Sequence, residues 1–339
     1  MSILIRQYNL ASKCLYLLSA RRCLITAGSS ITSTKKCPKR RAESNKPEQG
    51  ASTNPTKAEV NATTAKSSPG ADLVTAARAK LLKESGIELR SRLASVGLAT
   101  QGTKASMADK FLSHVQSVAS KPFPSDVFSL DMGYLNIGIT HIKITASRTK
   151  PMLALTKWEL VNPDLPPVYN VHNYAAGAIN IVTQHLLPPT ASNQPQHMAY
   201  IIERQHWRPS TAMAHILQRV RGMEAMIFAI LLDRTSHSPH HVTVESVQAR
   251  SVMDHLGYNL LSNSASKKKR AITLVKNWLD GSKRVDRDLA ELTYSEAHVK
   301  MFEATSKKDD LADSLFMAVA WIEWRLVALE YGRKELGMT

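Results

Sequence analysis

The most constraining feature of this sequence is the run DVFSLDMGYLNIGITHIKIT at residues 126–145, where apolar and polar residues alternate and many side chains are β-branched. Alternation with a period of two is typical of strands that bury one face. Gly133 and Asn136 interrupt it, and both residue types favour turns. We therefore expect one strand, a turn over Gly133–Asn136 and a second strand, so the core of this chain must contain a sheet.

The elements expected after this hairpin alternate between strands and helices, which is typical of a mixed α/β sheet with helices on its faces. The last helix is expected to be amphipathic, and the segment before it is expected to be helical and basic. We predict a five-stranded mixed sheet in a domain spanning residues 123–335. The further strands are expected at 153–161, 197–205 and 241–249, and the helices at 175–187, 210–234, 265–303 and 307–332.

Ahead of this domain, residues 72–118 carry apolar residues at three- and four-residue steps, as helices with one buried face do. Gly97 is expected to end a helix, and Gly102 to open a tight basic turn before Lys104. The string LRSRLASVGLATQGTKASMADKFLSHV resembles a SAP motif, a small helical module that binds DNA. That resemblance implies phosphate contacts by Lys104 and its basic neighbours, without base reading. The alternative is a plain helical hairpin that packs on the core.

The N-terminal tail supplies much of the basic character of the chain, which has a net charge of +16. Residues 1–42 contain no acidic residue and many Arg, Lys, Ser and Thr. This composition predicts a mitochondrial transit peptide and hence a place in the matrix. A secretory signal would need a longer apolar centre. Residues 43–71, rich in Ser, Thr, Asn and Pro, are expected to form a disordered linker.

Cysteine usage and hydropathy exclude several classes of protein. All three cysteines lie in the tail, at Cys14, Cys23 and Cys37, so the folded part can contain neither disulfides nor cysteine-zinc sites. No run approaches the roughly 18 apolar residues of a spanning helix, so no membrane partner is expected. The basic balance instead favours a polyanion such as a nucleic acid.

Acidic residues stand at the ends of buried elements in three distant segments. Asp131 ends an apolar strand, Glu203 ends another, and Asp310 and Asp313 open the last helix, with Asp309 beside them. A carboxylate next to an apolar strand loses hydration, and several converging carboxylates repel one another. A divalent cation is their natural partner, and Mg²⁺ favours carboxylates, water and phosphate oxygens. The helix dipole also favours acids in a first helical turn, and this is the alternative role of Asp309.

Together these strings resemble a known family. SLDMGYLNIG, IIERQHWRPS and KKDDLADSLFMAVAWIEWR are similar to segments of the fungal mitochondrial Holliday junction resolvases, relatives of bacterial RuvC-type resolvases on the RNase H fold. The likeness spans roughly residues 89–325, including the SAP-like module and the basic string SKKKR. It implies an RNase H-like fold with catalytic Asp131, Glu203, Asp310 and Asp313. The same residues and Asp309 are the implied metal ligands, and the implied DNA contacts are Lys104, Asn136, Gln205, Arg208, Lys267, Lys268, Lys269, Lys307 and Lys308.

The resemblance also implies cofactors and partners. We expect Mg²⁺ or Mn²⁺, two ions per active site, four-way junction DNA as substrate, and no small-molecule cofactor. Since a junction is cut symmetrically, a homodimer is expected. The Met-rich helix 210–233 could form its interface or could face the core. The alternatives are another RNase H-like nuclease, acting on RNA–DNA hybrids or flaps, and a non-catalytic mitochondrial DNA-binding protein.

Overall fold

The computed structural model describes most of the chain from residue 69 onward. The described residues are 69–133, 135–145, 150–166, 168–187, 196–204, 214–236, 240–257, 264–281 and 289–338. The chain divides into two units, Met1–Thr64 and Ala65–Thr339, and every described residue belongs to the second. The transit-peptide prediction lies outside the described residues. The predicted linker was too long at its end, because helix α2 already begins at Pro69.

In the described part of the chain, six strands form one sheet in the order β5-β4-β1-β2-β3-β6. The first three strands form an antiparallel meander, and β4, β5 and β6 join it in parallel, β4 beside β1, β5 beside β4 and β6 beside β3. The strands are β1 Asp126–Met132, β2 Ile137–Thr145, β3 Met152–Val161, β4 His197–Arg204, β5 His241–Gln248 and β6 Glu291–Thr293. The mixed α/β class is confirmed, and the expected hairpin turns between Met132 and Ile137.

The expected number of five strands was wrong. The sixth strand, β6, lies inside the segment 265–303 that we predicted to be helical, and it has only three residues. So short a strand shows no period of two, and it is held by its pairing with β3 rather than by its own sequence. The rest of that segment contains the expected helices, α8 Ser264–Leu279 and α9 Glu296–Ala304.

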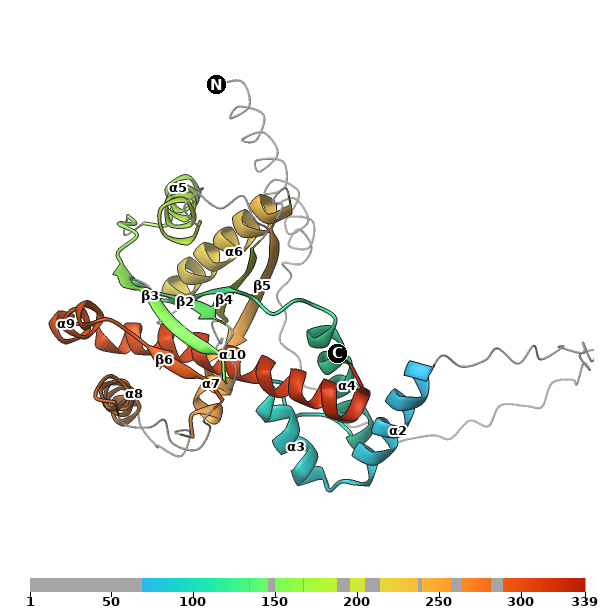
Figure 1. Cartoon of the computed structure of the whole chain (residues 1–339). Coiled ribbons are helices and arrows are strands. Elements are labelled where there is room, and N and C mark those ends of the chain that lie inside the picture. The colour runs from blue at the N-terminus through green and yellow to red at the C-terminus, as the bar shows by residue number, and fades with distance from the viewer. Residues whose placement is uncertain are drawn as a thin grey trace, which may run out of the picture. The chain divides into compact units, whose positions relative to one another are not determined.

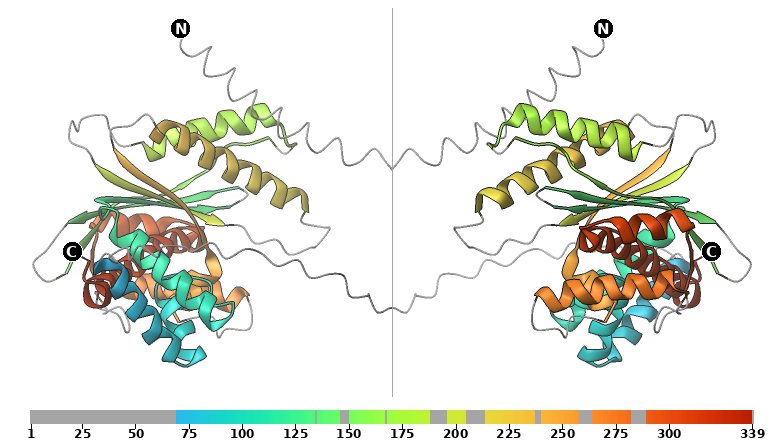
Figure 2. Two further views of the ribbon diagram at one scale, coloured as in Figure 1. Left: turned by 90° about the vertical axis from the view of Figure 1, so that its right-hand side faces the viewer. Right: turned by 90° about the vertical axis from the view of Figure 1, so that its left-hand side faces the viewer.

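The two faces of the sheet bury different side chains of the same strands. Phe128, Leu130 and Met132 of β1 pack under helices α5 (Val171–Ile181) and α6 (Ala214–Ser236), with a π-helical turn at Val182–Leu186. The alternate residues of β1 face the other layer, which α10 (Lys308–Leu336) dominates. Figure 2 shows the sheet between these two helical layers. The period of two in β1 thereby divides the core into two halves.

Helix α10 is the central element of the second layer. We expected an amphipathic helix, but every residue from Ser314 to Arg325 is buried. The helix crosses the sheet on one side and is covered by α4, α7 (Ala249–His255) and α8 on its others. A helix enclosed in this way is apolar around its circumference instead of along one stripe. None of the described helices is both long and apolar enough to cross a membrane.

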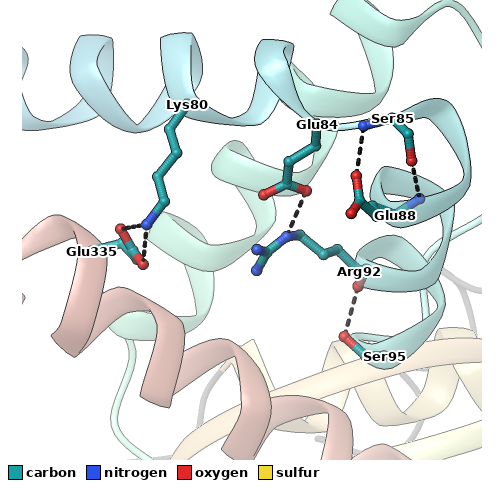
Figure 3. A network of polar contacts seen from close by, with 7 residues as sticks. All are labelled: Lys80, Glu84, Ser85, Glu88, Arg92, Ser95 and Glu335. Atoms are coloured by element: carbon teal, nitrogen blue, oxygen red, sulfur yellow. Dashed lines mark hydrogen bonds and ion pairs between the residues drawn. The ribbon is translucent and has the colours of Figure 1, made fainter.

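Helices α2 (Pro69–Lys83), α3 (Gly86–Ser95) and α4 (Lys104–Ala119) form a small module with its own apolar core. Ser85 and Glu88 form a capping box that begins α3, and Lys80 pairs with Glu335 of α10 (Figure 3). The module core includes Ala328 and Leu336, so it packs against the C-terminal half of α10 (Figure 1). This packing agrees with the hairpin alternative, while DNA binding by the SAP-like module stays a prediction.

The glycines of the module behave as the sequence indicates. Gly97 follows α3 with a φ of 74°, and Gly102 has a φ of 129° directly before Thr103, which caps α4. Both angles lie in a region that L-residues rarely adopt. Gly97 has a second reason to lack a side chain, since a Cβ there would lie 2.4 Å from the ring of Trp324. The module is therefore seated tightly on α10 at this point.

Candidate active site

Two acidic residues that close neighbouring strands lie side by side. Strand β4 runs parallel to β1, and Leu130 pairs with Ile202. One residue further along both strands brings Asp131 beside Glu203 on the face that carries α10. After burial, the neighbouring Glu203 carboxyl is the largest influence that raises the pKa of Asp131. The parallel register thus joins two segments that are far apart in the sequence.

The start of α10 comes to the same place because Gly138 leaves room for it. Asp131 pairs with Gly138 across β1 and β2. A Cβ on Gly138 would lie 2.3 Å from the carbonyl oxygen of Asp310, a distance that no side chain tolerates. Sequence analysis missed this residue, although a glycine inside a strand signals close approach by another backbone. Gly138 therefore sets the position of the first turn of α10 beside Asp131.

Polar side chains inside the core anchor the helix to the sheet. Ser129 donates a hydrogen bond to the carbonyl oxygen of Ser314 at 2.6 Å, and the Thr140 and Ser314 hydroxyls are 2.8 Å apart. The Trp158 indole donates to the carbonyl oxygen of Leu311 at 2.9 Å. Ser129, Thr140 and Ser314 are fully buried. Because unmade bonds of buried polar groups are costly, these bonds hold α10 in one register. Their signal in the sequence is a hydroxyl at a position where the alternation requires an apolar residue.

The acidic residues influence one another from all three chain segments. Burial raises the pKa of Asp131 well above its ordinary value, and the charges of Glu203, Asp310 and Asp309 raise it further. Burial, followed by the charges of Asp131, Asp309 and Asp310, raises the pKa of Asp313 to about 8. The structure thereby brings together all five acidic residues that the sequence singled out. Asp313 is surrounded by protein atoms but keeps exposed side-chain surface, so the cluster can be reached from outside.

The paired acids Asp309 and Asp310 differ in their surroundings. Lys268 of α8 forms an ion pair with Asp309. Partial burial opposes ionisation of Asp309, but the hydrogen bond to Lys268, a backbone hydrogen bond and the charges of Lys268 and Lys307 together outweigh it and lower its pKa. For Asp310, burial and the charge of Asp309 raise the pKa instead. Asp310 also acts more strongly than Asp309 on Asp131. Asp309 is thus tied to the basic helix α8, while Asp310 belongs to the acidic cluster.

The cluster fits a hard divalent cation by the chemistry of its donors. It consists of carboxylates alone, which suit Mg²⁺ and Mn²⁺. Three of its members have raised pKa values, so full ionisation of the cluster is disfavoured unless a cation compensates its charge. Among the described residues, however, no three acidic, histidine or cysteine side chains already have the spacing of a metal cage. The oxygen donors are gathered here, but they pair with each other and with Lys268.

The predicted DNA-binding residues differ in exposure and in their hydrogen bonds, and of those that the structure describes only Lys268 and Lys307 are linked to the acidic cluster. Lys268 and Lys269 are exposed on α8, and Lys307 is exposed before α10. Lys308 donates to the carbonyl oxygens of Glu303 and Thr305 at 2.8 and 2.7 Å, so it closes the end of α9 instead of facing a ligand. Lys267 and Asn136 are half-buried, as is Lys104 in the separate helical module. Gln205 and Arg208 lie outside the described residues.

A protein-family model matches residues 127–329, which is more than half of the chain. The family is described as mitochondrial resolvase Ydc2 / RNA splicing MRS1. The matched range contains the complete acidic cluster and all six strands except the first residue of β1. Among curated proteins, no significant match was found.

Solved structures give a further comparison. The crystal structure of the yeast mitochondrial Holliday junction resolvase Ydc2 matches with a TM-score of 0.52 and 18% sequence identity, covering 73% of this chain and 96% of that one. Thermus thermophilus RuvC in complex with a Holliday junction matches at a TM-score of 0.32 and 14% identity, over 57% of this chain and 91% of that one. A fowlpox virus resolvase complex matches at 0.35 and 14%, over 58% and 97%. The first match confirms the expected resolvase-type, RNase H-like fold.

Proposed function

This chain belongs to the mitochondrial resolvase Ydc2 / RNA splicing MRS1 family, and we infer from that membership that it is an endonuclease that resolves four-way (Holliday) junctions in mitochondrial DNA. Its reaction is hydrolysis of a phosphodiester bond in each of two strands, and it takes place in the matrix. The family description covers nucleolytic and RNA-splicing proteins, so a feature of this chain has to distinguish between them.

The acidic cluster is the observation that favours the nuclease. Binding RNA requires no gathering of carboxylates, and a negative cluster would repel a phosphate backbone. Here three features of the fold place acids together. They are the register of β1 and β4, the glycine at position 138 and the anchored start of α10. So costly an arrangement is typical of catalytic sites, where raised pKa values accompany function. The gathered carboxylates no longer repel one another when cations and a scissile phosphate occupy the site.

Asp131, Glu203, Asp310 and Asp313 are the residues we assign to holding two Mg²⁺ or Mn²⁺ ions. When bound, such ions activate the attacking water and offset the charge on the leaving oxygen. Because burial and the neighbouring acids raise the pKa of Asp131, cations compete with protons for this carboxylate. Asp309 is the less direct member, because Lys268 already compensates its charge. Its role is to position Lys268 at the edge of the site.

The basic residues around the cluster are assigned to the DNA backbone. The exposed lysines of α8 extend from the site along one helix, and Lys307 stands at the start of α10. They bind phosphates without sequence preference and give the affinity its dependence on salt. Lys104 and the SAP-like module would extend this contact to the junction arms.

A homodimer is the form that suits a substrate with two equivalent strands to cut. Of the methionines of α6, Met223 is fully buried in the core, and Met226 is only partly buried against it. The outer face of the same helix does carry a stripe of apolar residues, and Leu232 is 49% exposed. This stripe borders β5, the edge strand of the sheet. The stripe consists of Ala225, Phe228, Ala229 and Leu232, and we assign a second copy of the chain to it.

The decisive experiment is cleavage of a synthetic four-way junction by the purified protein, with and without Mg²⁺. Linear duplex, flap and RNA–DNA hybrid of the same sequences serve as alternative substrates. We expect paired symmetric cuts in the junction alone, and only with the cation. The Asp131→Asn variant should bind the junction as the wild type does but cut it at least ~1,000-fold more slowly. Preference for the hybrid or flap would contradict resolution, and unchanged cutting by Asp131→Asn would contradict the assigned site.

A further inference from the structure

A cavity of about 340 Å³ lies between the helical module, the end of β5 and the middle of α10. Its wall includes Leu98 and His114 of the module, Gln248 of β5, and Trp324 and Arg325 of α10. A buried water occupies roughly 30 Å³, so this cavity is far larger than a few trapped waters need. It falls at the lower end of the volumes of small-molecule sites, which begin near about 300 Å³.

Polar groups without partners are concentrated at this cavity. Arg325 is only 4% exposed, yet its Nε has no hydrogen-bond partner among the residues that the structure describes. Within the same described part, His114 Nε2 and Trp324 Nε1 are also buried and unpaired. Burying such atoms without partners costs free energy, so each of them needs an explanation. A ligand that brings hydrogen-bonding groups to the cavity would provide one after a side-chain rotation, because each of these atoms has almost no accessible surface as it stands.

The cavity contains an acidic group as well as a basic one. Glu245 accepts from the Trp321 indole at 2.7 Å and pairs with Arg325 at 3.5 Å. The Arg325 guanidinium also lies over the Trp321 ring, 4.6 Å from its centroid. A simple anion would be repelled by Glu245, and an apolar ligand would leave the donors unpaired. A flat heterocycle that carries both carbonyl and amino groups suits these walls, and nucleobases have this chemistry.

The place of the cavity in the fold connects it to DNA. Arg204 lines it and directly follows Glu203 of the acidic cluster. The carboxyl ends of the parallel strands β4 and β5 share one edge of the sheet, and that edge carries both the cluster and the cavity. Arg204 is exposed and available to a phosphate. A strand bound at the cluster can therefore reach the cavity within a few nucleotides.

We propose that this cavity receives one unstacked nucleobase of the junction DNA, and that Gln248, Arg325 and His114 determine which base is accepted and hence where the strand is cut. The proposal rests on the proposed function. The crossover of a four-way junction is where bases unstack at low cost, as they do at other interrupted sites. The helical module then has a task besides backbone binding, because its residues His114 and Leu98 close the pocket.

The test uses the full-length protein and four-way junctions that carry 2-aminopurine at successive positions around the crossover. Ca²⁺ replaces Mg²⁺ so that binding occurs without cutting. We expect a rise in 2-aminopurine fluorescence at one position, which reports an unstacked base. Gln248→Ala and Arg325→Met should remove that rise. They should also lower the ratio of cutting rates between preferred and other sequences by roughly tenfold. Gln184→Ala, an exposed glutamine on the opposite face of the sheet, is the matched control and should change neither.

Two results would overturn the proposal. In the first, Gln248→Ala and Arg325→Met both keep the fluorescence rise and the cutting preference. In the second, the wild type binds and cuts the junction but shows no fluorescence rise at any position. If the wild type neither binds nor cuts junctions, the proposed function fails, and the cavity is then tested separately. Deoxynucleoside monophosphates should quench tryptophan emission in the wild type but not in Gln248→Ala. Equal quenching by deoxyribose 5-phosphate, or none by any nucleotide, would exclude a base pocket.

Discussion

The charges of individual residues in the acidic cluster lower the stability of the fold, although the proposed function requires them. Asp131 and Asp313 are placed where burial and neighbouring acids disfavour their charge. A group with a raised pKa in the folded protein stabilises the fold only while it is protonated. The cluster therefore weakens the metal-free protein at neutral pH, in exchange for a site that binds cations. This cost can be measured one residue at a time.

Asp313→Asn should stabilise the metal-free protein near pH 8 and leave its stability unchanged near pH 4. The folded-state pKa of Asp313 is about 8, whereas an aspartate in an unfolded chain titrates at about 3.9. Its destabilising effect consequently grows as the pH rises from the second value towards the first. Because Asp313 is open to solvent, screening reduces the effect to about 1 kcal/mol, or roughly 2–4 °C in Tm.

Thermal unfolding in EDTA at the two pH values measures this difference. Added Mg²⁺ should raise the Tm of the wild type and have less effect on the variant, because ligands stabilise the state that binds them. Equal stability of the two proteins near pH 8 would show that Asp313 lies outside the cluster.

Gly138→Val should disable cutting and also reduce stability. Its side chain would collide with the Asp310 carbonyl oxygen and displace the first turn of α10. Overpacking of this kind costs about 1–3 kcal/mol, and a shift of the acids by about 1 Å costs roughly 100-fold in rate. Gly86→Ala is the control, since a Cβ at Gly86 meets nothing within 4 Å. Cleavage rates and Tm values of both variants test this prediction. Full activity of Gly138→Val would contradict the close approach of the Asp310 carbonyl oxygen to Gly138.

At the scale of elements, α10 connects every functional part of the described protein. Its first turn carries acids, its middle lines the cavity, and its last turns hold the helical module. The bonds from Ser129, Thr140 and Trp158 set its register at one end. The contact between Gly97 and the Trp324 ring sets the position of the module at the middle of the helix. A displacement of the module is therefore transmitted to the cavity through one rigid helix.

Gly97→Ala should loosen the module. The substitution adds backbone strain, because φ is 74°, and a collision with Trp324. Gly257→Ala isolates the first effect, since Gly257 has a φ of 73° but open space around its Cβ position. We expect a loss of about 1 kcal/mol for Gly257→Ala and at least about 2 kcal/mol for Gly97→Ala. Denaturant unfolding measures the free energy of unfolding of both variants. Equal losses of stability would mean that the Trp324 ring moves aside without a free-energy cost.

For the whole molecule, the proposed dimer has the same twofold symmetry as the junction that it cuts. Both the acidic cluster and the assigned interface of α6 lie in the same unit of the chain, on opposite faces of the sheet. Two copies related by a twofold axis would present two clusters to the two equivalent strands of a junction. The edge strand β5 would also be covered, which protects an otherwise open edge.

Leu232→Asp should convert a dimer to a monomer. Leu232 is the most exposed large side chain of the apolar stripe, and a charge there would be buried without a partner in the interface, so association should weaken by at least ~100-fold. Light scattering during gel filtration measures the mass. Ile87→Asp, at a residue of the helical module that is 77% exposed, is the control and should leave the mass unchanged. A wild type that is monomeric at all concentrations would rule out this interface.

Much of the element pattern could be predicted because it depends on local chemistry. The alternation in β1 and β2, the turn between them and the glycine after α3 follow from residue periods and backbone freedom. The strand β6 and the buried circumference of α10 could not be predicted in this way. A strand of three residues and a fully covered helix acquire their character from neighbours that are distant in the sequence.

The sequence by itself determined which acids stand at the ends of buried elements and which family the strings resemble. Only the tertiary structure decided that Asp310 joins Asp131 while Asp309 turns to Lys268, that Gly138 admits the helix, and that a cavity opens between the module and α10. The physical reason is range. Periodicity and caps act within a few residues, whereas strand register joins β1 to β4 about seventy residues further on, and close approach joins Gly138 to Asp310, more than one hundred residues away.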